Sequence, residues 1–83
     1  MKDETNTSET TNTIYSQLRR EFGSIHEPME FRTVAKYIEI NKSSLKAAHG
    51  LFLEHASATN WNVVIYYMVL YQYWSQKKVM ADV

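Results

Sequence analysis

The sequence predicts a mainly α-helical domain, a bundle of about four helices whose last, strongly apolar segment is either a helix or a strand. Three observations lead to this prediction. Apolar residues recur at helical spacing in two stretches, 13–22 and 31–48. The small and polar residues 56–60 are typical of a loop and a helix cap. The fourteen residues that follow, 61–74, are almost entirely apolar.

The composition fits one globular domain and excludes several classes of protein. Of 83 residues, 45% are hydrophobic and 22% charged, which is typical of a folded domain. Nine Lys and Arg balance nine Asp and Glu, so a polybasic, histone-like protein is excluded. The chain has no cysteine, hence no disulfide or thiolate site, which fits a reducing compartment. Since the first residues are polar and acidic, we expect no signal peptide and an intracellular protein, cytoplasmic or nuclear.

The chain divides into a polar tail, residues 1–12, and a single domain, residues 13–83. The tail has almost no apolar residues to offset its ordering entropy, so we expect it to be disordered. The first helix is expected over Thr13–Phe22, where apolar residues recur at a spacing of four. Asn12 is suited to cap its start, and Gly23 to follow its end in a left-handed conformation.

Two further helices are expected in the middle of the chain. Pro28 fits the first position of the second helix, where its missing N–H costs nothing. An amphipathic stripe follows it: Phe31, Val34, Ala35 and Ile38. Asn41 is a good cap for the start of a third helix, which Gly50 would end near His49 unless the helix continues through it.

Residues 31–48 have the apolar spacing of a helix-turn-helix. This motif needs a small residue where its two helices cross, and Ala35 provides one. Apolar residues occupy the positions that the motif buries: Val34, Ile38, Ile40 and Leu45. The stretch VAKYIEINKSSLKAA resembles the helix-turn-helix of small bacterial, plasmid and phage regulators and of winged-helix proteins. It departs from their pattern at Glu39, where the turn usually has glycine.

The resemblance implies a transcriptional regulator that occupies a DNA operator as a homodimer, with Asn41–His49 as the recognition helix. Serine and lysine side chains on that helix donate to phosphates and base edges, and two cations on the preceding helix reach the DNA backbone. The predicted DNA-binding residues are Arg32, Lys36, Lys42, Ser43, Ser44 and Lys46. Four basic residues and one Glu give the window 32–46 a net charge of +3, a value that solvated helix faces also reach.

The segment 61–74 holds more than half of the aromatic residues of the chain. Its Val, Ile and Tyr content raises strand propensity, as in the wing of a winged helix, but fourteen residues without a turn signal favour a helix. A helix that is apolar all round cannot turn every side into a small core, so we expect it to pair with a second copy or another protein. The predicted interface residues are Trp61, Tyr66, Tyr67, Tyr71, Tyr73 and Trp74. Its unbroken apolar run, 63–71, is too short to span a membrane.

Motifs for catalysis or metal binding are absent from the sequence. The three histidines, His26, His49 and His55, lack the spacing of a zinc-protease helix. No serine lies in a nucleophile elbow, and two glycines are too few for a phosphate-binding loop. We therefore expect neither enzymatic activity nor a metal or cofactor.

The alternative to a regulator is a non-catalytic protein–protein interaction module that uses the aromatic segment. Many helix-turn-helix and winged-helix domains bind proteins, and this arrangement is similar to the N-terminal domain of the third subunit of eukaryotic DNA polymerase delta. That resemblance implies a docking domain or inhibitor. The neutral chain and the lack of arginine in the candidate recognition helix favour this alternative.

Overall fold

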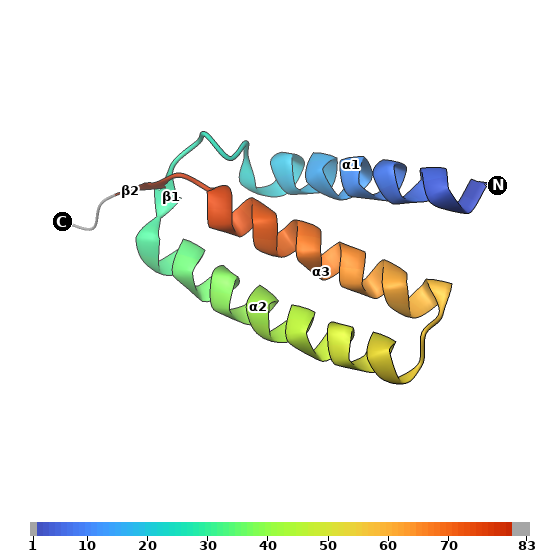
Figure 1. Ribbon diagram of the computed structural model, residues 1–83. Coiled ribbons are helices and arrows are strands. Elements are labelled where there is room, and N and C mark those ends of the chain that lie inside the picture. Colours follow the sequence, from blue (N-terminus) through green and yellow to red (C-terminus); the bar gives the residue numbers. More distant parts are fainter. Residues whose placement is uncertain (1, 81–83) are drawn as a thin grey trace.

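The computed structural model describes residues 2–80, which form three helices and two short strands (Figure 1). In chain order the elements are α1 (Lys2–Phe22), β1 (Met29–Glu30), α2 (Phe31–Glu54), α3 (Ala58–Gln76) and β2 (Val79–Met80). The two strands pair in parallel. The expected helical class is confirmed, but residues 2–80 contain three helices rather than four, and no wing.

The three helices lie side by side in one layer, with α3 in the middle (Figure 1). The backbones of α1 and α2 both pack against α3 but do not approach each other. The molecule measures 48 × 24 × 15 Å, so it is only about one helix thick. Such a layer buries two sides of its middle helix and leaves two broad faces open to other molecules.

Helix α1 ends where the sequence predicts but begins much earlier. Gly23 follows it at a φ of 86°, and its N–H donates to the Arg19 carbonyl at 2.9 Å, as expected of a left-handed helix end. The helix starts at Lys2 rather than at the expected Thr13, and the disorder expected for the tail stays a prediction. Extending an anchored helix avoids the cost of nucleation, which allows it to continue into polar sequence. Met1, which belongs to the predicted tail, lies outside the described residues. So do residues 81–83, which belong to the predicted domain.

Helix α2 is a single helix of 24 residues and contains no turn. The predicted turn near Glu39 and the separate helix starting at Asn41 are therefore wrong. Asn41 is buried in mid-helix, where its amide donates to the Tyr37 carbonyl at 2.8 Å instead of capping an N-terminus. The helix also passes through Gly50 and ends at Glu54.

The start of α2 also differs from the prediction. Pro28 precedes the helix by three residues, because Met29 and Glu30 form β1 instead. The Met29 N–H donates to the Lys78 carbonyl at 3.1 Å, and the Lys78 N–H donates to the Ile25 carbonyl at 2.8 Å. These bonds tie the connector between α1 and α2 to the segment after α3.

The aromatic segment is helical, which settles the choice between helix and strand. Ser57 caps α3, because its hydroxyl accepts a hydrogen bond from the Asn60 N–H at 3.1 Å. The 19 residues of α3 include no charged residue. A helix of this composition is stable in water only with apolar neighbours on several sides, and its place between α1 and α2 supplies two of them.

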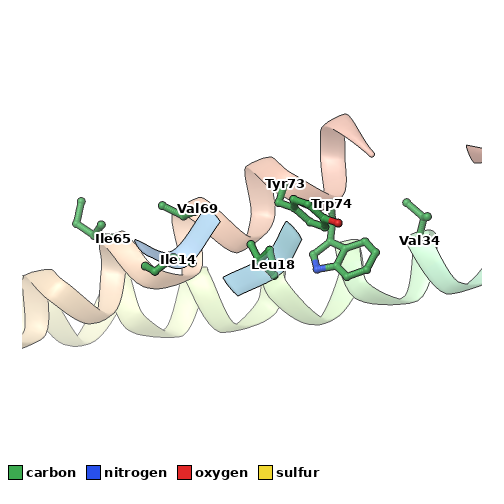
Figure 2. Close-up of a cluster of buried hydrophobic side chains, with 7 residues drawn as sticks. All are labelled: Ile14, Leu18, Val34, Ile65, Val69, Tyr73 and Trp74. Carbon is green, nitrogen blue, oxygen red and sulfur yellow. The ribbon is translucent and has the colours of Figure 1, made fainter. Parts of the chain in front are cut away.

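The core lies between α3 and its two neighbours. Figure 2 shows its buried side chains, which are Ile14 and Leu18 of α1, Val34 of α2, and Ile65, Val69, Tyr73 and Trp74 of α3. Trp74 stacks on Tyr37 with ring centroids 4.4 Å apart and meets Phe22 edge-on at 4.9 Å. The aromatic contacts thus join all three helices at the end of the layer that holds the strands.

Candidate functional site

The residues predicted to bind DNA all lie on α2. Arg32, Lys36, Lys42, Ser43 and Lys46 are exposed, and Ser44 is half-buried. They extend over 14 residue steps, or about 21 Å of one straight helix. Because the turn is absent, the window 41–49 is not a separate recognition helix that projects from the domain. DNA contact by these cations remains a prediction.

The predicted interface residues divide into two groups. Trp61 and Tyr66 are exposed, and Tyr67 and Tyr71 are half-buried. Tyr73 and Trp74 are 0% and 1% exposed and belong to the core, so their assignment to an interface is wrong. The reason is their place at the end of α3, where the aromatic contacts with α1 and α2 enclose them.

One broad side of the layer, here called the apolar face, carries two neighbouring grooves. The larger, of about 310 Å³, lies between all three helices; the other, of about 280 Å³, lies between α2 and α3, and Tyr67 lines both. The most open apolar side chains of this face are Ile40, Ala47 and Leu51 of α2 and Val63, Tyr66, Tyr67 and Leu70 of α3. Glu21 of α1 is the single charged residue among those that line the two grooves.

Large apolar side chains of this face remain open to water. Ile40, Leu51, Val63 and Tyr66 are each 38–48% exposed. Sequence reasoning missed the contribution of α2, because Ile40 was expected to be buried at a turn. The signal was the uncharged row at positions 37, 40, 44, 47 and 51, which falls on one side only when the helix is unbroken.

A third groove, here called the basic groove, is formed by α2 and α3 and shares no residue with the apolar face. It has a volume of about 380 Å³ and is lined by Lys42, Leu45, Lys46, His49, Val64 and Met68. On α3, Met68 lies two residues from Tyr66, a rotation of about 200°, which places these side chains on opposite sides of the helix. The two lysines predicted for DNA thus border an apolar groove.

The end of α1 is held by two side chains from the end of α3. The Lys77 ammonium is buried and donates to the carbonyls of Phe22 and Ser24 at 2.8 and 2.7 Å. The Tyr73 hydroxyl donates to the Gly23 carbonyl at 2.6 Å. Phe22 is the last residue of α1, and Gly23 and Ser24 follow it, so the ammonium lies at the negative end of the α1 dipole, which favours a cation. We call this arrangement the clasp; sequence reasoning had left Lys77 unassigned.

Burial raises the pKa of the Tyr73 hydroxyl above the usual value of 10.0, and the negative charge of Glu27 raises it further. The hydroxyl is therefore protonated at neutral pH and able to donate to Gly23. The clasp requires this donor, since a phenolate would place a negative charge against a carbonyl oxygen.

Other kinds of site receive no support from the part of the chain that the structure describes. Residues 9–80, whose side chains the structure describes, contain no cluster of three or more His, Asp or Glu side chains able to hold a metal ion. Among residues 2–80, none of the helices has the length and apolarity needed to cross a membrane. Comparison with protein-family models, with curated proteins and with solved structures gives no match to this chain.

Proposed function

We propose that this chain is a non-catalytic protein-interaction module, and that its apolar face pairs with the same face of a second copy. The observation that supports this most directly is the composition of the face. Its large apolar side chains are open to water, and Glu21 is the one charge among the residues that line its grooves. The groove between the three helices is also lined by the polar residues Gln17 and Asn41, and exposed apolar patches rimmed by polar residues mark interaction sites on proteins.

The area of the layer is sufficient for a stable pair. The rectangle that encloses the layer measures 48 by 24 Å, or about 1,150 Å², so a standard interface of about 800 Å² per partner would take up most of one broad side. The accessible surface is 5973 Å², whereas a compact monomer of 9.8 kDa exposes about 5,200 Å². This excess, about 800 Å², reflects the open arrangement of the three helices in one layer.

The charge of the face favours a second copy as its partner. A twofold pair brings two copies of the same patch together, so charges of one sign are doubled and no opposite charge is added. Tyr66 and Ile40 bring no charge to such a contact, and Glu21 belongs to α1, at the border of the layer. Pairing two such faces would enclose α3 from a third side.

Sedimentation velocity over about 1–100 µM protein tests the pairing. We expect a reversible dimer, which Ile40→Lys weakens at least about 100-fold, because the variant places two cations among the apolar side chains of the interface. Ile40 lies outside the core cluster, so the variant should keep its helical circular dichroism. Ser43→Lys, an exposed position on the outer side of α2, adds the same charge and should leave the dimer unchanged.

Two results would contradict the proposal. One is a wild-type chain that stays monomeric across the whole concentration range. The other is a dimer that Ile40→Lys and Ser43→Lys affect equally, because self-association would then not depend on the apolar face.

A further inference from the structure

The basic groove combines an apolar base with cations along one border. Leu45, Val64 and Met68 are buried or half-buried and form the base. Lys42, Lys46 and His49 are exposed and follow one another at i, i+4 and i+7 of α2. The opposite border belongs to α3, which has no charged residue. A molecule in this groove therefore meets apolar atoms below and cations on one side only.

The lysines of the basic groove disfavour a second copy of this chain, which is the partner proposed for the apolar face. A second copy seated symmetrically here would bring four lysines into one interface whose lining contains no carboxylate, which is unfavourable. Glu39 is the acidic neighbour of this row; it lies beside Lys42 and Lys46 on the outer side of α2 but does not line the groove. The border of the groove thus keeps a positive charge that an acidic partner would complement.

We propose that the basic groove binds an acidic amphipathic helix of a partner protein. The apolar side of that helix covers Met68, Leu45 and Val64, and its carboxylates reach the lysines. Lys42 and Lys46 are about 6 Å apart along α2, which matches carboxylates at i and i+4 of a second helix lying alongside. A helix placed in an apolar groove is a common mode of peptide recognition.

A DNA duplex fits this groove less well than a helix does. Its phosphates would meet the two lysines, but a charged backbone would then lie over the apolar base. A duplex is therefore the competing outcome of the experiment.

The probe is a fluorescent, end-capped peptide of about 16 residues, long enough to form a helix on binding. Leu residues lie along one side and Glu residues at i and i+4 beside them, and a second peptide has Gln in place of every Glu. Binding is measured by anisotropy at about 50 and 500 mM salt. A labelled mixed-sequence duplex is measured in parallel.

We expect the Glu peptide to bind, with an affinity that falls about tenfold in the double variant Lys42→Gln/Lys46→Gln, in Met68→Glu, and at the higher salt concentration. Lys36→Gln is the matched control, because Lys36 is exposed on the same helix but does not line the groove. It should bind the peptide as the wild type does. All variants should keep the helical circular dichroism of the wild type.

Three results would overturn the proposal. The first is equal binding of the Glu and Gln peptides, which would mean that the carboxylates of the peptide do not contribute to its affinity. The double variant and Lys36→Gln behave alike, so the lysines are not contacted. The duplex binds and loses affinity in the double variant while the peptide does not bind, which would assign the lysines to nucleic acid instead.

Discussion

The apolar face and the basic groove are built from neighbouring residues of α2 and α3, yet they differ in charge and in their need for α1. The apolar face lacks charge over most of its area, which suits a twofold pair. The basic groove has two lysines on one side and suits a partner of opposite charge. One pair of helices can thus offer two different surfaces when charge is confined to one side.

The second difference is structural. Ile14, Gln17 and Glu21 of α1 line the main groove of the apolar face, whereas the basic groove is made by α2 and α3 alone. Changes that loosen α1 should therefore weaken self-pairing and leave peptide binding in place.

Lys77→Ala should give the largest effect on stability, lowering the free energy of unfolding by about 2–3 kcal/mol. The substitution removes two charge-assisted hydrogen bonds to the carbonyls at the end of α1. Urea unfolding followed by circular dichroism measures the loss, with Lys78→Ala as the exposed control next to it. Dimerisation should weaken while peptide binding persists. If the two variants were equally stable, the hydrogen bonds of Lys77 would not stabilise the fold.

Tyr73→Phe should cost about 1 kcal/mol, because the Gly23 carbonyl loses its donor. The wild type should also lose stability as the pH rises above 10. The pKa of folded Tyr73 is raised, so the unfolded chain releases this proton first and alkaline pH favours unfolding. Tyr73→Phe should lack that part of the decline, and exposed Tyr66→Phe should retain it. Matching alkaline profiles for all three proteins would refute this assignment.

Gly50→Ala should have the smallest effect, a gain of roughly 0.5–1 kcal/mol. The position is exposed in mid-helix, and an added Cβ would have no atom within 4 Å. Gly23→Ala is the contrasting change, since this glycine has a φ of 86° and its Cβ would collide with the Glu27 carboxylate. Thermal unfolding should shift upward for the first and downward for the second; shifts of the same sign would contradict the account. Neither surface should change its binding in Gly50→Ala.

Local sequence signals predicted the parts of the fold that local physics decides. The spacing of Ile14, Leu18 and Phe22 with the following Gly23 gave the end of α1 correctly. The cap signal at Asn41 failed, because an N-cap contributes only about 1 kcal/mol and packing along α3 outweighs it. A polar segment such as 2–12 has no apolar pattern, so its helix was not visible in the sequence.

The candidate sites were harder to predict, because they depend on which side of each helix is covered. α3 has no polar side, so nothing in its sequence separates exposed Tyr66 from buried Tyr73 and Trp74. Lys42 and Lys46 were correctly expected to be exposed, but their border on an apolar groove depends on the α2–α3 packing. The sequence indicates which residue types are suited to contact a partner, but only the arrangement of the helices decides on which of the two surfaces each residue lies.

The most direct test of the two-surface account compares Tyr66→Lys with Met68→Lys in sedimentation equilibrium. The two positions are two residues apart on α3, one on the apolar face and one in the basic groove. We expect Tyr66→Lys to be monomeric at concentrations where Met68→Lys and the wild type are dimers. Dimerisation of both variants like that of the wild type, or loss of the dimer in Met68→Lys alone, would show that the apolar face is not the pairing surface.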